Sequence, residues 1–346
     1  MRGRCRLNRR QMDRKRAHPL VLYAVGIVLL VSCNTTHEGA PSITQRRVDA
    51  GTIHGLVIGP KGTLWYTHDC NAVTRLDTDG SSTTFYVPTI RKYDFVGPSE
   101  NLFSTGCTSS SLGVGSIAIG RDDALWFTEN TEAVIGRMTR SGSVRFFPIS
   151  HGWAAQRIVS GPKGDLWFTQ MYGNAIGRIS MTGKITEYRL QNKNSHPYDI
   201  VEGPDGALWF TEHGDGKIGR LTTAGALTEY AIPTAGSTPL SIAVGSDGAL
   251  WFTEVGAQKI GRITTSGAIT EYSLTRLGPG PDFIAADSKG TLWFTEEVAG
   301  KVGRISTDGS VAEYDVPTHP YFIIKGNADT MWFTEPRSSL IGKLKI

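Results

Sequence analysis

The sequence predicts an all-β fold, a seven-bladed β-propeller with four strands in each blade. The phrase Leu-Trp-Phe-Thr-Glu and close variants of it recur along the chain, and most successive copies are 41 or 42 residues apart. Each unit contains several short, alternating, β-prone stretches that glycine-containing turns separate. A period near forty residues with several strands per unit is typical of propellers. The tryptophans of the seven copies are Trp65, Trp126, Trp167, Trp209, Trp251, Trp293 and Trp332.

Residues 1–33 are predicted to be a lipoprotein-type signal peptide. A basic region is followed by the apolar run Leu20–Val31 and by Ser32-Cys33. This order is typical of an export signal, and the run is too short to span a bilayer comfortably. The end of the segment matches the lipobox of bacterial lipoproteins, which predicts lipidation of Cys33. The alternative is an ordinary signal peptide with an incidental cysteine.

The positive charge of the chain belongs to this N-terminal segment. The whole chain has 36 Lys and Arg and 32 Asp and Glu, a formal charge of +4. Residues 1–33 hold eight of the basic residues and one Asp, which leaves 28 basic and 31 acidic residues and a formal charge of −3. Nothing in this balance indicates a nucleic-acid partner.

The export signal and the charge together predict where the protein works. We expect a monomer on the outer side of the cytoplasmic membrane or at the outer membrane. The lipid would be its only contact with the membrane.

Residues 34–42 are predicted to be a flexible tether and residues 43–346 the propeller. The chain ends within the third strand of the seventh blade, so that blade lacks an outer strand. The segment 43–48 precedes the first blade and has no blade of its own. We expect it to supply the missing strand, because this pairing joins the two ends of the ring and removes an exposed strand edge.

The first interval between tryptophans, at 61 residues, is longer than the others and indicates an insertion at about residues 89–112. Cys107 lies in this insertion, and Cys70 lies in a loop of blade one on the same face. Two cysteines in an exported domain favour one disulfide, although spacing alone does not establish that their Cβ atoms meet. We predict a Cys70–Cys107 disulfide beside the shaft.

Residues that recur in most blades are predicted to serve the scaffold. The third residue after the tryptophan is Glu in five blades, and the eleventh is Arg in five blades. A carboxylate and a guanidinium that recur together suggest a structural pair or a hydrogen-bonded clasp.

Residues that differ between blades mark the candidate site. Counting eleven back from each tryptophan reaches the start of the innermost strand, at the mouth of the shaft. The seven residues there are His54, Gly115, Gln156, Tyr198, Leu240, Asp282 and Tyr321. Blades six, seven and one adjoin in a closed ring, so Asp282, Tyr321 and His54 share one sector, with His319 two residues before Tyr321. Such a group could transfer protons; the alternative is a polar, water-filled mouth without chemistry.

The repeated phrases resemble those of the streptogramin B lyases over about residues 43–346. The segments 203–212 (Gly-Pro-Asp-Gly-Ala-Leu-Trp-Phe-Thr-Glu), 217–222 (Lys-Ile-Gly-Arg-Leu-Thr) and 227–233 (Leu-Thr-Glu-Tyr-Ala-Ile-Pro) carry the resemblance. It implies a carbon–oxygen lyase that opens a cyclic depsipeptide antibiotic at its ester by β-elimination, with Mg²⁺. A base would remove the proton α to the ester carbonyl, and the metal ion would offset the enolate charge.

This chain departs from the functional positions of that family. The family has a tyrosine where this chain has His54, a histidine where it has Asp282, and Glu-Pro-His where it has His319-Pro320-Tyr321. A last family glutamate falls near Glu335, out of register by one. Shifted chemistry would use His54 or His319 as base, with Asp282 or Glu335 near a metal ion.

Three functions therefore stay open. The first is a Mg²⁺-dependent lyase acting on an ester. The second is a non-catalytic propeller that binds a small molecule, a peptide, a glycan or a protein at the shaft mouth, with the loop 89–112 as part of the recognition surface. The third, a lactonase-like hydrolase, would require a fuller set of Asp, Asn and Glu ligands in the shaft.

Overall fold

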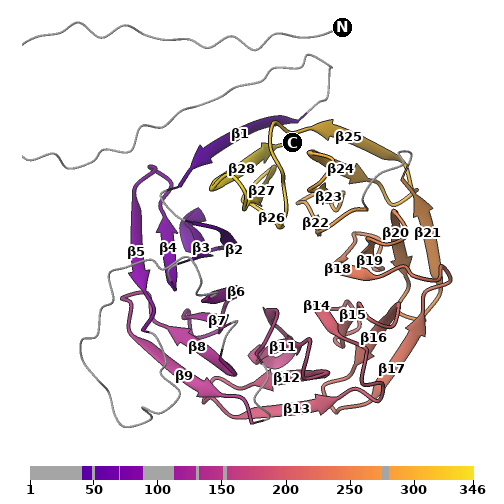
Figure 1. The fold of residues 1–346 in the computed structure, drawn as a ribbon, viewed down its shortest axis with the longest axis horizontal. Coiled ribbons are helices and arrows are strands. Elements are labelled where there is room, and N and C mark those ends of the chain that lie inside the picture. Colours follow the sequence, from indigo (N-terminus) through magenta and orange to yellow (C-terminus); the bar gives the residue numbers. More distant parts are fainter. Residues whose placement is uncertain are drawn as a thin grey trace, which may run out of the picture.

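Seven four-stranded antiparallel sheets form a ring around a central shaft (Figure 1). This computed structural model describes residues 41–48, 51–69, 71–88, 113–129, 132–150, 154–274 and 280–346. The predicted seven-bladed propeller is confirmed. In the described ranges, no helix has the length and apolar character needed to cross a membrane.

Several predictions fall outside the described residues. These are the signal peptide 1–33 with Cys33, the tether up to residue 40, the insertion 89–112, and both cysteines of the Cys70–Cys107 pair.

The strands follow one another from the shaft outward in each blade. Blade one consists of β2 (Ile53–Ile58), β3 (Leu64–His68), β4 (Ala72–Leu76) and β5 (Ser82–Tyr86). Blade two consists of β6 (Val114–Ile119), β7 (Leu125–Glu129), β8 (Val134–Met138) and β9 (Val144–Pro148). Blade three consists of β10 (Ile158–Ser160), β11 (Leu166–Gln170), β12 (Ala175–Ile179) and β13 (Ile185–Arg189). Blade four consists of β14 (Pro197–Glu202), β15 (Leu208–Glu212), β16 (Lys217–Leu221) and β17 (Leu227–Ala231).

The second half of the ring repeats this order. Blade five consists of β18 (Pro239–Val244), β19 (Leu250–Glu254), β20 (Lys259–Ile263) and β21 (Ile269–Ser273). Blade six consists of β22 (Ile284–Ala286), β23 (Leu292–Glu296), β24 (Lys301–Ile305) and β25 (Val311–Asp315). Blade seven consists of β26 (Ile323–Lys325), β27 (Thr330–Glu335), β28 (Leu340–Lys345) and β1 (Ser42–Arg47).

The N-terminal strand closes the ring, as predicted. Strand β1 pairs antiparallel with β28, and Ile43 faces Leu344 in the register. The strand begins at Ser42, one residue earlier than expected. A side-chain hydrogen bond of 2.6 Å from Gln45 Nε2 to Glu335 Oε1 adds a buried polar contact to this closure.

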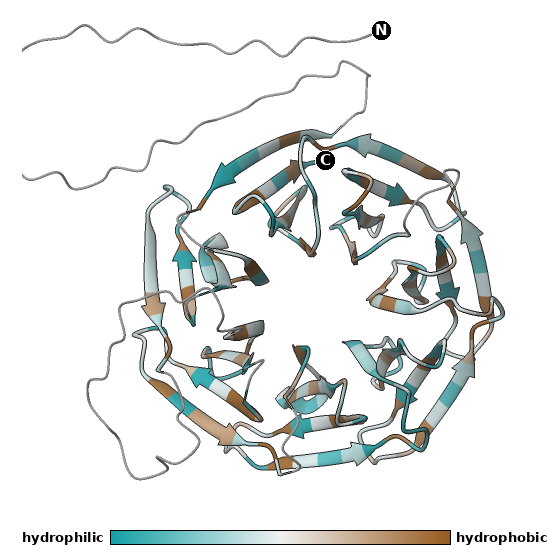
Figure 2. Cartoon of the chain, viewed as in Figure 1, coloured by the Kyte–Doolittle hydropathy of each residue, from teal (hydrophilic) through white to brown (hydrophobic). Residues whose placement is uncertain are grey.

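The core lies between adjacent blades rather than inside each one. Trp251 is fully buried and packs in one cluster with Phe294 of the next blade. The ring of Tyr272, on the outer strand of the tryptophan's own blade, stacks on it at 5.4 Å. Hydrophobic and hydrophilic residues are interspersed along the strands around the whole ring (Figure 2). Burial of such aromatic side chains between blades contributes strongly to the stability of the ring.

The predicted Glu–Arg pair is wrong, because the two positions lie at opposite ends of the same hairpin. Arg262 faces Trp251 in the register, and its guanidinium lies 5.9 Å from the centre of that ring. Its Nε donates to Asp247 at 2.6 Å, and the other oxygen of Asp247 accepts from Trp251 Nε1 at 3.2 Å. Glu254 instead faces Lys259. The recurring arginine therefore secures the tryptophan.

Candidate functional site

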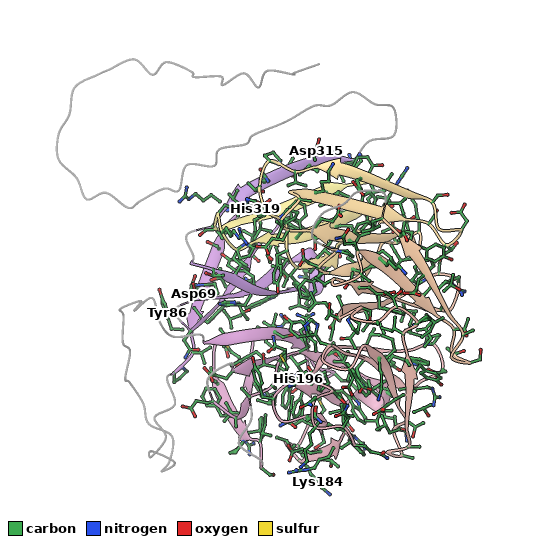
Figure 3. All side chains as sticks on the ribbon, turned by 45° about the vertical axis from the view of Figure 1, so that its right-hand side comes forward. Asp69, Tyr86, Lys184, His196, Asp315 and His319 are labelled. Atoms are coloured by element: carbon green, nitrogen blue, oxygen red, sulfur yellow. The ribbon has the colours of Figure 1, made fainter. Side chains whose placement is uncertain are left out.

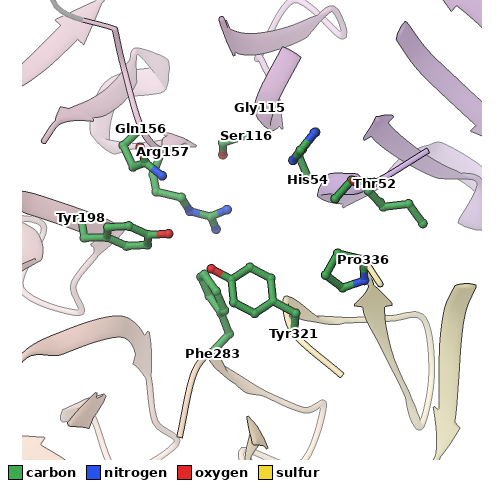
Figure 4. A pocket seen from close by; sticks show the side chains of 11 residues that line it. Thr52, His54, Gly115, Ser116, Gln156, Arg157, Tyr198, Phe283, Tyr321 and Pro336 are labelled. Carbon is green, nitrogen blue, oxygen red and sulfur yellow. The ribbon is translucent and has the colours of Figure 1, made fainter. Parts of the chain in front are cut away.

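A cavity of about 180 Å³ opens at the mouth of the shaft (Figure 4). Six of the seven blades contribute to its wall. The lining residues are Thr52, Ile53, His54, Gly115, Ser116, Gln156, Arg157, Tyr198, Phe283, Tyr321 and Pro336. Five of the seven positions found by counting back from the tryptophans are among them, so the periodicity located this site.

The innermost strands present these side chains because the regular pairing of each strand with its neighbour is interrupted at the same place. In blades one, two, four and five the register of the inner strand shifts around the tenth and eleventh residues before the tryptophan, as between Ile53 and Gly55. In the other three blades the paired segment begins only after these positions, at Ile158, Ile284 and Ile323. Such irregularities re-aim side chains away from the sheet. Here the residues at these irregularities include His54, Gln156, Arg157, Tyr198 and Tyr321 of the cavity wall.

His54 is held by a carboxylate. Its Nε2 lies 2.8 Å from Asp69 Oδ1, and its side chain is 18% exposed. Asp69 also accepts a 2.7 Å hydrogen bond from the backbone N–H of Thr52. Burial alone would raise the pKa of Asp69, but the hydrogen bonds from Thr52 and His54 outweigh it and lower this pKa. The charged carboxylate therefore favours a proton on Nε2, so that Nδ1 of the neutral ring can accept one.

Arg157 crosses the cavity from blade three. Its guanidinium carbon lies 4.2 Å from the ring centre of Phe322 and 5.7 Å from that of Phe283, in blades seven and six. Its Nε donates to Asp199 of blade four at 3.2 Å. Sequence reasoning missed this pair. The available signal was the tenth residue before each tryptophan, which is charged at Arg157 and Asp199 and is Gly, Ser or Phe in the other blades.

Two phenols face the same space. The ring of Tyr321 packs edge-on against Phe283 at 4.9 Å. Burial first, and then the neighbouring hydroxyl of Tyr198, raises the pKa of Tyr321. Its hydroxyl therefore keeps its proton and can donate a hydrogen bond into the cavity (Figure 4).

Asp282 and His319 lie beside the cavity rather than in its wall. The Asp282 carboxylate accepts a 2.7 Å hydrogen bond from the backbone N–H of Glu297. Burial raises the pKa of Asp282 to about 6. His319 is exposed, and its Nδ1 lies 2.9 Å from the carbonyl oxygen of Glu297. His319 and Asp69 lie on the same side of the ring (Figure 3). Of the four predicted catalytic residues, His54 and Tyr321 therefore line the cavity. Asp282 and His319 do not.

The predicted metal ligand Glu335 has other partners. Its carboxylate is fully buried and accepts from Gln45 Nε2 at 2.6 Å and from Ser338 Oγ at 3.3 Å, and burial raises its pKa. In the part of the chain that the structure describes, no three His, Cys, Asp or Glu side chains are grouped as metal ligands. The ionisable nitrogen side chains in the cavity wall, His54 and Arg157, do not form the oxygen-rich donor set that Mg²⁺ prefers. These residues therefore do not fit the ion that the resemblance implies.

Comparison with known proteins agrees with this architecture. The chain superposes on the virginiamycin B lyase from Staphylococcus aureus with a TM-score of 0.77 and 36% identity, covering 88% of this chain and 99% of that one. A catalytically inactive variant of that enzyme, solved with quinupristin, gives a TM-score of 0.78 at the same identity and coverage. A streptogramin B lyase matches with a TM-score of 0.77 and 34% identity, over 88% of this chain and 97% of that one.

Matches at lower identity show the fold alone. The hydrazine synthase of Kuenenia stuttgartiensis, at 14% identity, has a TM-score of 0.69 and covers 87% of this chain and 97% of that one. No curated protein sequence matches the chain. The model of the virginiamycin B lyase family matches residues 105–346, which is more than half of the chain, and with the solved lyase structures it shows that the chain belongs to the virginiamycin B lyase family.

Proposed function

We propose that the protein is a carbon–oxygen lyase that cleaves an ester by β-elimination, with His54 as the base. The observation that carries this proposal is His54 in the cavity wall, paired with Asp69 behind it at 2.8 Å between Nε2 and Oδ1. A base that is held by a carboxylate and faces a cavity can remove a proton from a bound substrate. Solved relatives of this chain are named as lyases, which supports the same reaction class.

The reaction can be written with the residues of this chain. Nδ1 of neutral His54 would take the proton from the carbon α to a carbonyl group. The electron pair of that C–H bond forms a carbon–carbon double bond to the β-carbon, the bond from the β-carbon to the ester oxygen breaks, and the acyl group leaves as a carboxylate. Asp69 would stabilise the imidazolium that forms. The phenol of Tyr321 would donate a hydrogen bond to the carbonyl oxygen as charge develops there.

Quinupristin is the first substrate to test, because a relative with 36% identity was solved with it. Elimination opens the ring without a change in mass, whereas hydrolysis adds one water, so mass spectrometry with fragmentation separates the two reactions. We expect a linear, unsaturated product. An EDTA arm tests the Mg²⁺ requirement that the resemblance implies.

Variants of the histidines make the test specific. His54→Ala should lower the rate by about 10²–10⁴-fold, the usual contribution of a general base. Asp69→Asn should lower kcat and shift the pH profile, because it removes the charge that sets the tautomer of His54. His196→Asn is the matched control, since His196 lies outside the cavity wall. Full activity in His54→Ala would refute the assignment.

A non-catalytic binding propeller is the second candidate. It is favoured if, as the resemblance implies, His54, Asp282 and His319-Pro320-Tyr321 stand at the family's functional positions in place of its own residues. Intact quinupristin after prolonged incubation, together with saturable binding of a ligand at the mouth, would favour this function over the first.

The proposed setting is the same for both functions. We propose an exported monomer with a lipid on Cys33 and the propeller in the periplasm or at the cell surface. Metabolic labelling with a radioactive fatty acid, compared between the parent and Cys33→Ser, tests the anchor. Equal labelling would refute it.

A further inference from the structure

The cavity contains one guanidinium that no catalytic role has so far used. The Arg157 side chain is 13% exposed, and its flat face rests on the aromatic rings of Phe322 and Phe283. An arginine placed in this way is fixed in position before any ligand binds, and this lowers the entropic cost of binding.

Asp199 holds the guanidinium in place and accepts a hydrogen bond from its Nε alone. The Asp199 carboxylate is buried and accepts four hydrogen bonds. They come from Arg157 Nε at 3.2 Å, Ile200 N at 3.0 Å, Ser241 Oγ at 2.7 Å and Ile242 N at 3.1 Å. The carboxylate thus has its own donors on both oxygens and takes only one N–H of the arginine. Within the described ranges, the structure records no acceptor for the two terminal nitrogens.

The other polar groups around the guanidinium are suited to the same kind of ligand. Arg157, Tyr198 and Tyr321 extend toward one common space (Figure 4). The phenol hydroxyls and the Gln156 amide can all donate hydrogen bonds. Among the described residues of the wall there is no Asp or Glu. The cavity wall therefore offers hydrogen-bond donors and a guanidinium. The neighbouring carboxylates of Asp199 and Asp69 lie outside the wall and have hydrogen-bond donors of their own.

We infer that Arg157 forms a carboxylate-binding site at the shaft mouth. The two terminal nitrogens of a guanidinium match the two oxygens of a carboxylate in a bidentate pair. A single cation and a cavity of about 180 Å³ suit a monocarboxylate better than a multiply charged phosphate ester. The carboxylate would belong either to a small organic acid or to the C-terminus of a peptide.

The site would also have a use in the proposed reaction, where it would receive the carboxylate that leaves. The inference does not depend on that reaction, because binding is measured without turnover. Carboxylate binding without elimination would support this site and refute the lyase. Elimination without carboxylate binding would support the lyase and refute this site.

The test compares acids with their uncharged counterparts. Saturation-transfer NMR with the full protein, which detects millimolar affinities, would use N-acetylphenylalanine against N-acetylphenylalaninamide. We expect the acid to bind at least about tenfold more tightly than the amide, because a hydrogen bond to a charged group contributes more than 1.4 kcal/mol. Benzoate tests the small-acid source: binding as tight as that of the peptide acid points to free organic acids, and weaker binding points to a peptide C-terminus. Both outcomes retain the carboxylate site.

Variants connect the binding to this arginine. Arg157→Met should abolish the preference for the acid, and Arg157→Lys should keep part of it, since lysine retains the charge but loses the fork. Arg220→Met is the matched control, because Arg220 pairs with Asp205 and stacks on a tryptophan in blade four. Tyr198→Phe supplies a second variant if Arg157→Met fails to fold, and it should weaken acid binding while the ring stays in place. Equal binding of acid and amide, no binding of either, or an unchanged preference in Arg157→Met would overturn the inference.

Discussion

Glu254 on β19 is a buried carboxyl group whose ionisation should work against the folded state. It is 0% exposed, and its Oε1 lies against Gly261 of β20, whose register partner on β21 is Glu271. Burial first, and then the charge of Glu271, raises the pKa of Glu254 from 4.5 to about 8. The Glu254 carboxyl group is therefore protonated in the folded protein at neutral pH, whereas in the unfolded chain it is ionised.

The sign and the size of the effect follow from this shift. Because the pKa is higher in the folded state, the stabilising contribution of the group is complete below pH 4.5 and is lost as the pH rises through about 8. One pKa unit corresponds to about 1.4 kcal/mol, so the full shift has a ceiling of about 5 kcal/mol. The nearby Lys259 and relaxation of the Glu254–Glu271 pair reduce this contribution below its ceiling, and we expect about 1–2 kcal/mol.

The substitution Glu254→Gln isolates this effect, because glutamine has nearly the shape of the protonated acid and does not ionise. Denaturant unfolding at pH 5 and at pH 8.5 should give nearly equal stabilities for variant and parent at the lower pH. At the higher pH the variant should be more stable by about 1–2 kcal/mol. The exposed Glu202→Gln is the matched control and should show no such change. A difference that is the same at both pH values, or that reverses in sign, would refute the reasoning.

Two further substitutions test the scaffold. Gly261→Ala should destabilise the protein by about 1–3 kcal/mol in thermal or denaturant unfolding, because the added Cβ would lie 2.1 Å from the Phe252 ring in a filled core; an unchanged midpoint would contradict this packing. Gln45→Leu should cost about 1–3 kcal/mol, because it leaves the buried Glu335 carboxyl without its 2.6 Å donor and weakens the closure of the ring. The Gln45 effect should disappear in a Glu335→Leu background, and its persistence there would place the cost elsewhere.

Much of the architecture could be predicted from the sequence because the same strand pattern recurs in seven blades. The tryptophan spacing predicted the blades, and the missing outer strand predicted the pairing of β1 with β28. The same count located the mouth of the shaft, where His54 and Tyr321 line the cavity. These inferences rest on period and pairing, which are properties of the order of residues along the chain.

Contacts between blades required the tertiary structure. The spacing of the repeats brought Arg157 and Asp199 to equivalent positions, but only the folded ring places the guanidinium over Phe322 and Phe283, more than a hundred residues away in sequence. Asp69 lies one residue beyond β3, and its contact with His54 forms within blade one, where the register of β2 against β3 shifts between Ile53 and Gly55. The sequence by itself determined the seven blades, their closure and the position of the mouth, because these follow from local strand periodicity. The chemistry of the mouth was decided only in the tertiary structure, because a long side chain selects its partners by its reach across the shaft.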